Sequence, residues 1–374
     1  MLVLFCLAFI MPGTAAAEES TKEELSIQTA LEMAFRNNPD FRLAELEVRK
    51  AELQMEDIID LVDYFPTYGR VTTEYSQVLN AYYGADIGLK TAQRAKLVSK
   101  DKIAAEVIAA YAEALINENN MHSLQRTLAN TRDLYQVSNV ANRIGFISTY
   151  DYDNSTTGLQ QMEEGLRASQ LAYEGSIANL RTLLGQHPDW TPVLTSEALI
   201  TEYARSELSN EIIVGASESV LVWTKEALLD IEKNKEFWFI PGLTREMQEV
   251  NLDTSELSYA DAKRTARLTI EQMYYRIDTI EGQIDMVELD YKKALKEEKV
   301  ARLKYDLGLI PRVSLIPGAD NLESAVLATS QAATNLSNLK LQLAGLKSQY
   351  TFMTGREVFD AADWSTPPMV EAEI

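Results

Sequence analysis

A row of apolar and small residues recurs at alternating steps of three and four along residues 270–305, and it restricts the fold more strongly than any other feature. Its members are Ile270, Met273, Ile277, Ile280, Ile284, Val287, Tyr291, Ala294, Ala301 and Tyr305, interrupted only by Glu298. This spacing is typical of a coiled-coil seam and continues for about five heptads. The segment is therefore predicted to be one long helix packed along its seam against a partner helix.

The same row occurs a second time, 163 residues earlier in the chain, with more polar members. These are Ala114, Asn117, Met121, Leu124, Leu128, Thr131, Tyr135, Ser138 and Asn142. Each row ends at a glycine, Gly145 in the first copy and Gly308 in the second, within similar flanking residues. The sequence therefore predicts two copies of one unit, in which a long helix reverses direction at a glycine turn.

A second helical stretch follows each of these glycines, over about 150–184 and 322–354. These stretches stop at Gly185 and Gly355, and a glycine just past the last turn is the expected end of a helix. The second copy is longer between its two glycines by seven residues, which we place in the loop Pro311–Asp320. Because seven residues make one heptad, the facing stripes stay in phase.

Proline is absent between residues 67 and 187 and between 242 and 310, so very long helices are permitted. A helix from about Lys102 to Asn142 would be about 60 Å long. The predicted fold class is all-α or mainly α, with long antiparallel coiled-coil helices in two tandem repeats and at most a reduced β-hairpin region. We place the first repeat at 18–192 and the second at 193–374.

The first residues have the pattern of a secretory signal peptide. An apolar run, Leu2–Met11, is broken by Pro12 and Gly13 and followed by Ala15, Ala16 and Ala17. This order of a short apolar region and a small-residue cleavage site predicts a signal peptide over 1–17 and a secreted mature chain. No Lys or Arg precedes the run, and the alternative is a buried N-terminal helix.

Charge and composition exclude several classes of function. The chain of 374 residues has a net charge of −21, which disfavours nucleic-acid binding. One cysteine and two separate histidines, His122 and His187, offer no metal site, and no phosphate loop, dinucleotide motif or nucleophile motif occurs. We therefore expect no enzyme activity, no cofactor and no metal.

The order of these features resembles the TolC family of outer-membrane efflux proteins. The stretch Leu25–Ala34, the residues Asn37–Asp40 and the stretch Glu45–Glu52 are similar to the opening helices of that family. Tyr64–Pro66 resembles the approach to its first β-hairpin, and the glycine turns resemble its helical tips. The resemblance covers nearly the whole mature chain and lies in the order and duplication of the segments.

The resemblance implies a homotrimer in which twelve strands form an outer-membrane barrel and twelve helices form a periplasmic tunnel. It also implies a periplasmic adaptor protein that docks on the tips and an inner-membrane pump. The tip residues it assigns to docking are Arg143, Gly145, Ser148, Gly308 and Pro311. Arg143 could instead satisfy the last carbonyls of its helix. Asp151 and Asp153 are interpreted as caps of the returning helix rather than as an acidic, cation-selecting pore mouth.

The sequence departs from the family in the two segments that should form membrane strands. Thr67–Lys90 has only mild alternation, and Phe237–Ser258 contains Pro241–Gly242 and five charged residues. Two functions follow. The first is an outer-membrane and periplasmic efflux conduit, a passive helical tunnel within a multi-part export system. The alternative is a secreted soluble coiled-coil scaffold that has lost the membrane pore.

Overall fold

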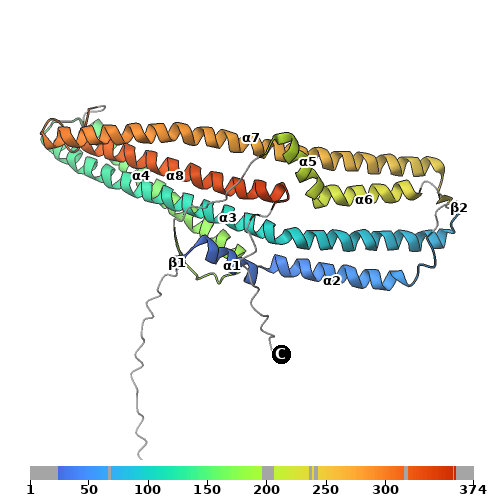
Figure 1. Ribbon diagram of the computed structural model, residues 1–374. Helices are drawn as coiled ribbons and strands as arrows, with labels where there is room; N and C mark the ends of the chain where they lie inside the picture. Colours follow the sequence, from blue (N-terminus) through green and yellow to red (C-terminus); the bar gives the residue numbers. More distant parts are fainter. Residues whose placement is uncertain are drawn as a thin grey trace, which may run out of the picture.

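The structure is a computed structural model that describes residues 24–65, 69–195, 206–235, 238–239, 243–315, 319–356 and 358. The expected signal peptide lies outside these residues. The described part is mainly helical, as predicted. Two helices extend along most of a rod: α3 (Thr73–Arg143) with 71 residues and α7 (Arg245–Asp306) with 62 residues (Figure 1).

Pairs of shorter helices lie end to end beside each long one. Next to α3 are α2 (Pro39–Ile59) and α4 (Thr149–Leu183), and next to α7 are α6 (Val220–Lys235) and α8 (Leu322–Met353). The helices lie in the order α4, α3, α8, α7 in one half of the rod and α2, α3, α6, α7 in the other (Figure 1). Helix α7 therefore forms one long edge, and α2 with α4 forms the other.

Two short helices lie near the middle of the rod. Helix α1 (Ile27–Asn37) precedes α2, and helix α5 (Leu208–Glu218) precedes α6, with a single residue between the helices of each pair. The cap after α1 is Asn38, whose side-chain oxygen accepts a hydrogen bond from the Asp40 N–H at 2.8 Å. This agrees with the break predicted at Asn37–Pro39.

Helix α3 starts far earlier than the predicted position near Lys102. Thr72 caps it, since its hydroxyl accepts a hydrogen bond from the Tyr75 N–H. Beyond Thr72 the buried residues Leu79 and Ile87 are spaced as on one face of a helix, and no proline interrupts the segment. At 1.5 Å per residue, α3 is about 105 Å long.

The two segments in which the resemblance implies membrane strands, 67–90 and 237–258, are largely helical where the structure describes them. Helix α3 contains residues 73–90 of the first segment, and α7 contains residues 245–258 of the second. Only two residues of each described part are strands, β2 (Gly69–Arg70) and β4 (Trp238–Phe239), and these pair in parallel. A second parallel pair joins β1 (Glu24–Leu25) to β3 (Val193–Leu194).

No helix within the described ranges has both the length and the apolar character that crossing a lipid bilayer requires.

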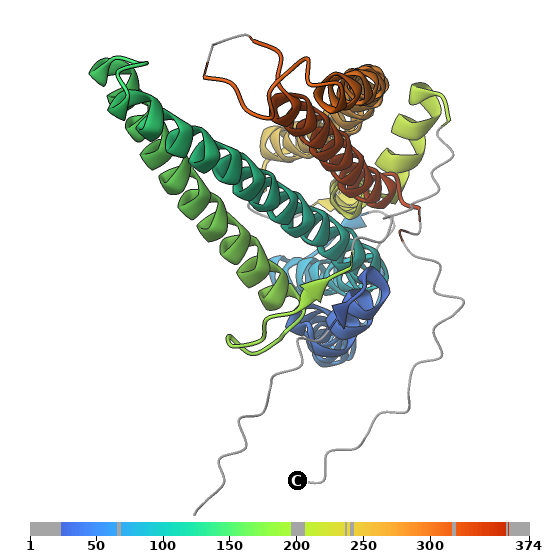
Figure 2. The same ribbon diagram turned by 90° about the vertical axis from the view of Figure 1, so that its left-hand side faces the viewer.

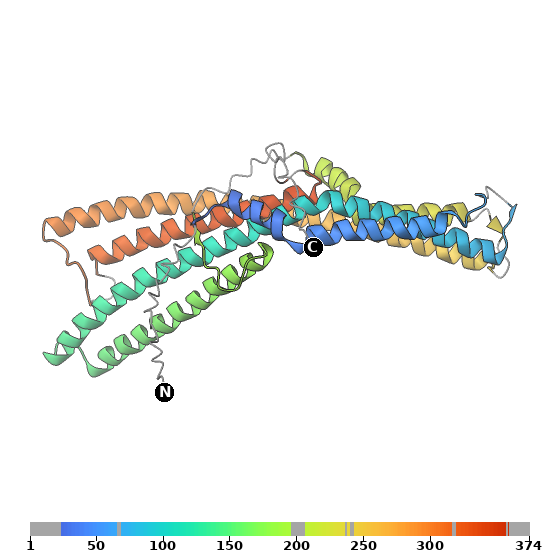
Figure 3. The same ribbon diagram turned by 90° about the horizontal axis from the view of Figure 1, so that it is seen from below.

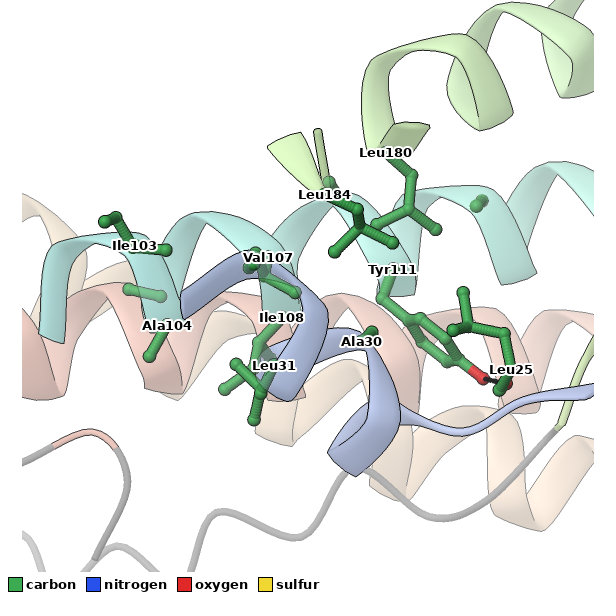
Figure 4. Packing of buried hydrophobic residues seen from close by; sticks show 14 of the residues in the cluster. Leu25, Ala30, Leu31, Ile103, Ala104, Val107, Ile108, Tyr111, Leu180 and Leu184 are labelled. Carbon is green, nitrogen blue, oxygen red and sulfur yellow. Dashed lines mark hydrogen bonds between the residues drawn. The ribbon is translucent and has the colours of Figure 1, made fainter. Parts of the chain in front are cut away.

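The main core lies where α1, α3 and the end of α4 meet, near the middle of the rod. Leu31, Val107, Tyr111 and Leu180 are among its buried side chains (Figure 4). The hydroxyl of Tyr111 lies 2.6 Å from the Leu25 carbonyl oxygen and ties β1 to α3. A smaller apolar cluster around Ile270, Ile277 and Tyr350 joins α7 to α8.

Both predicted seams pack as expected. Members of the α7 row are buried or half-buried as far as Ala301, and the α3 row is buried or half-buried throughout. Tyr305 is the exception, because α7 ends one residue later at Asp306 and Tyr305 is exposed at the tip.

Candidate functional site: the helix tips

Both hairpins reverse direction by the same backbone device. Gly145 has φ 74° and Gly308 has φ 71°, a conformation that favours glycine. At the first tip the Phe146 N–H donates to the Ala141 carbonyl at 2.8 Å, and at the second the Leu309 N–H donates to the Lys304 carbonyl at 2.8 Å. The Gly145 N–H also donates to the Asn142 carbonyl at 3.0 Å and the Gly308 N–H to the Tyr305 carbonyl at 2.8 Å, so each tip forms a Schellman motif. The predicted turns at Gly145 and near Gly308 are confirmed.

The returning helix of the first tip begins with a capping box. The Ser148 hydroxyl accepts a hydrogen bond from the Asp151 N–H at 3.1 Å, and the Asp151 carboxylate accepts one from the Ser148 N–H at 3.4 Å. The capping role expected of Asp151 is therefore confirmed. Asp153 lies two residues further into α4 and is not part of the cap.

The second tip is built differently, because its loop is longer. The Pro311 carbonyl accepts a hydrogen bond from the Leu322 N–H at 3.2 Å, which closes the base of the loop. Asn321 caps α8 by accepting from the Ser324 N–H at 2.9 Å. Pro311 thus lies beside the returning helix, and the extra residues of the second copy fall in the predicted loop.

The five residues assigned to docking fall into two groups. Arg143, Gly145 and Ser148 lie together at the first tip, whereas Gly308 and Pro311 lie at the second. Arg143 is the last residue of α3, and its exposed side chain makes no hydrogen bond or ion pair with the described residues. It therefore does not satisfy the carbonyls at the end of its helix.

Large apolar side chains flank both glycines and are exposed, a feature outside the docking residues predicted from the sequence. Ile144 is 74% exposed and Phe146 is 72% exposed, and at the second tip Leu307 and Leu309 are similarly open. An open groove runs up the last turns of α3 to the first tip. It is lined by Gln136, Val137, Val140, Ala141, Ile144, Phe146 and Leu315. The signal was present in the sequence as apolar residues on both sides of each glycine.

A basic side chain links the two hairpins near the tips. Arg312, in the loop after α7, lies 3.6 Å from the Asp133 carboxylate on α3 and 3.5 Å from the Glu323 carboxylate on α8. The loop reaches across toward α3 (Figure 3). The first hairpin has its own polar link, because the Tyr135 and Tyr152 hydroxyls are 2.9 Å apart. That hydrogen bond raises the pKa of Tyr152 above its ordinary value.

Within the described residues, no group of three or more His, Cys, Asp or Glu side chains could hold a metal ion. The features that the tips offer are exposed apolar surface, one free guanidinium and stiff glycine turns. Such a surface suits recognition of another protein.

Solved outer-membrane channels have the same arrangement of helices. The chain is similar to the CmeC outer membrane channel of Campylobacter jejuni, with 13% identity, 88% of this chain and 86% of that chain covered, and a TM-score of 0.59. For the open-state MtrE channel of Neisseria gonorrhoeae, identity is 14%, 89% of each chain is covered and the TM-score is 0.58.

The outer-membrane channel OprN is also similar, with 14% identity, 87% of this chain and 90% of that chain covered, and a TM-score of 0.61. No protein-family model and no curated protein matches the chain. At these identities the likeness concerns the fold, and it confirms the fold that the TolC resemblance predicted.

Proposed function

We propose that this chain, which has the fold of outer-membrane channels, is one subunit of a passive conduit for export across the periplasm and the outer membrane. The observation that supports this most directly is a second seam on α7, opposite the one that packs on α8. Its exposed apolar members are Leu268, Tyr275, Met286, Leu289, Val300 and Leu303, and the exposed Leu307 follows as the C-cap of the helix. Apolar side chains exposed along one face over this length are typical of a surface that a partner covers.

The opposite edge of the subunit offers a complementary surface. That edge is formed by α4 in the half of the rod that holds the row, where Leu171 is exposed, and by α2 in the other half, where Leu43, Leu46 and Leu53 are exposed (Figure 1). In that other half α7 exposes Met247, Val250 and Leu257. A head-to-tail contact between the two edges, repeated around an axis, closes a ring when the rotation permits. With two repeats per chain, 18–192 and 193–374, we propose a homotrimer with α-helical walls.

In this proposal the tips face the inner membrane and bind a periplasmic adaptor protein, which connects the conduit to an inner-membrane pump. The docking residues are Arg143, Gly145, Ser148, Gly308 and Pro311, together with the exposed Ile144 and Phe146. Residues 1–17 direct secretion as a signal peptide. The chain itself performs no catalysis and needs no cofactor.

Assembly is tested by Leu289→Glu, in the middle of the exposed seam, where Leu289 is 65% exposed. The substitution should leave helix content unchanged, because it adds a solvated charge in the monomer. It should abolish the trimer measured by light scattering, since the carboxylate would be buried between helices. The control is Gln283→Glu, an exposed position of α7 beside the seam. A monomeric wild-type protein in both buffer and detergent would contradict the proposal.

Docking is tested separately by Arg143→Glu. Folding should be retained, because an exposed charge at a helix end contributes only about 0.3–1 kcal/mol. Adaptor co-purification and export from cells should be lost. Unchanged export would show that the first tip is not a docking site, while the trimer measured above would still stand.

One observation favours the alternative, a secreted coiled-coil scaffold. Most of the two segments in which the resemblance implies membrane strands is helical, from Thr73 in α3 and from Arg245 in α7. Fractionation of cells decides between the two functions. Recovery with outer membranes and release only by detergent supports the conduit, whereas recovery in the soluble periplasmic fraction supports the scaffold.

A further inference from the structure

The two short helices α1 and α5 occupy equivalent positions in the two halves of the chain. Each has 11 residues, and the last residue of each packs against the glycine that ends a returning helix. A Cβ added to Gly185 would lie 2.9 Å from the Cβ of Asn37, and one added to Gly355 would overlap the side chain of Glu218. The first socket is thus the end of α4 with the adjoining part of α3, and the second is the end of α8 with α7.

Residue by residue, the helices present the same face to their sockets, with one exception. Ala34 of α1 corresponds to Gly215 of α5, and both are buried. Ala30 of α1 is completely buried, and its counterpart in α5 is Glu211, which is also completely buried. A methyl group in the first half is therefore matched by a carboxylate in the second.

The carboxylate is compensated by a cation of the second socket. Arg356, the residue after Gly355, donates a hydrogen bond to Glu211 Oε1 at 2.6 Å, and the Ser206 N–H donates to the same oxygen at 2.9 Å. Glu211 Oε2 has no hydrogen-bond partner among the described residues. The position after Gly185 is Gln186, which carries no charge.

The first socket uses neutral contacts instead. Asn38 donates its side-chain amide hydrogen to the Leu183 carbonyl at 3.1 Å, and Asn37 donates to the Leu184 carbonyl at 3.4 Å. These carbonyls lie at the end of α4, where the helix leaves them without intrahelical partners. The two sockets therefore share one arrangement and differ in polar chemistry. They also differ in one steric detail, because a Cβ added to Gly215 would lie 2.5 Å from the Cδ1 of Ile270, whereas the first socket holds Ala34.

This difference matters because the first socket holds the larger apolar core, and α5 is an apolar helix. Ile212, Ile213 and Val214 follow Glu211 directly, and Ile213 is 67% exposed in its present place. Thr195, beside the first socket, precedes Leu208 by 13 residues, which can span at most about 43 Å. Gly215 is smaller than Ala34, so shape does not keep α5 out of the first socket once α1 has left it and α6 has moved with α5. There the buried Glu211 would lose the Arg356 guanidinium.

We propose that the Glu211–Arg356 ion pair determines which socket α5 enters, and so fixes the order of the helices in a chain built from two similar halves. The pair acts mainly by excluding the wrong placement, since a buried carboxylate without a partner is strongly unfavourable. The inference rests on the internal repeat and not on the export function.

The test replaces both residues by their counterparts from the first half, in the variant Glu211→Ala/Arg356→Gln. Spin labels at Ser217→Cys on α5 and Thr182→Cys near the end of α4 report the placement, in a chain whose Cys6 is changed to Ser. Both label sites are exposed, and α5 lies away from the end of α4 (Figure 2). Mixing with an excess of unlabelled protein removes the contribution of distances between labels on different subunits.

The protein in which the Glu211–Arg356 ion pair is intact should give a single long distance between the two spin labels. The double variant should fold with undiminished helix content and show a second, shorter distance. Arg356→Gln alone should lower the urea midpoint, because it leaves Glu211 buried and unpaired, and adding Glu211→Ala should restore the midpoint. The matched control is Glu281→Ala/Lys347→Gln, which removes another ion pair between α7 and α8 at 2.8 Å and should leave one distance.

Two results would overturn the proposal. A double variant that keeps the single wild-type distance would show that the pair does not direct placement. A double variant that fails to fold would show that the pair is required for stability itself.

Discussion

At the scale of single residues, the most successful predictions from the sequence concern four glycines. Gly145, Gly185, Gly308 and Gly355 were expected to end helices, and all four have positive φ. Their surroundings differ in a way that the sequence cannot show. A Cβ at Gly145 or Gly308 would meet nothing within 4 Å, whereas Gly185 and Gly355 are packed against a short helix.

This difference gives a graded prediction. Gly145→Ala should lower the free energy of unfolding by about 1 kcal/mol, the cost of a positive φ for a residue with a side chain. Gly185→Ala should cost about 2–4 kcal/mol, because overpacking against Asn37 is added to the same strain. Urea denaturation followed by circular dichroism measures both, and equal losses would show that the contact with Asn37 is not rigid.

Glu211 is a residue whose role the sequence did not reveal, because a single Glu on a short helix looks like an ordinary solvated charge. Burial raises its pKa, but hydrogen bonds from Ser206 and Arg356 outweigh burial and hold the pKa below its ordinary value of 4.5. A lowered pKa means that the pair stabilises the fold above about pH 4.5 and less as pH falls through the folded-state value.

The expected result concerns the difference in unfolding free energy between the wild-type protein and Glu211→Gln. That difference should be constant from pH 7 to about 5 and should shrink at lower pH, as the wild-type carboxylate takes up a proton. Denaturation at a series of pH values measures it. A difference that stays constant down to pH 3 would mean that Glu211 does not titrate in this range.

At the scale of elements, the heptad rows predicted which helices pair and where they turn, but not where α3 begins. Between Thr73 and Lys90 the residues Leu79, Tyr83 and Ile87 follow helical spacing, yet mild alternation made strands look possible. Short apolar runs do not separate the two periods well. The N-cap at Thr72 was the missed local signal, because its Thr hydroxyl is a standard helix start.

The contact of Arg312 with Asp133 is an element-scale feature, since it holds the tip of one hairpin to the flank of the other. Its side chain is 62% exposed, so the ion pair contributes at most about 1 kcal/mol to stability. Arg312→Gln should leave the urea midpoint nearly unchanged. It should broaden the distribution of distances between spin labels at Asn139→Cys and Leu309→Cys.

High salt should broaden the same distance in the wild-type protein, because screening weakens exposed ion pairs. The control is Arg302→Gln, whose partner Glu298 lies on the same helix at 2.6 Å. If Arg312→Gln and Arg302→Gln give the same narrow distribution, the loop is held by its backbone contacts alone.

At the scale of the whole molecule, the duplication could be predicted because both halves repeat the same order of seams and glycines. The parallel pairs β1–β3 and β2–β4 could not, because each strand has only two residues and no period can be read from them. Each pair joins a segment of the first half to a segment of the second. Contacts of this kind depend on the assembled rod and leave no local trace.

The length of the rod can be altered experimentally. Inserting seven residues into each of α3, α4, α7 and α8, at matched positions in the heptad rows, should keep the seams in phase. The variant should remain helical and assembled and gain about 10 Å in length by small-angle X-ray scattering. Inserting one residue in each helix should abolish assembly, because it turns every later side chain by about 100°.

Helix α3 passes through both halves of the rod without a break, over 71 residues. The heptad spacing of its seams therefore allows only coarse steps in its length. Such a rod cannot grow or shrink gradually, since each change that keeps its seams in phase is a whole heptad made in several helices at once. The longer loop of the second hairpin adds no helical turn, because α8 has 32 residues and α4 has 35.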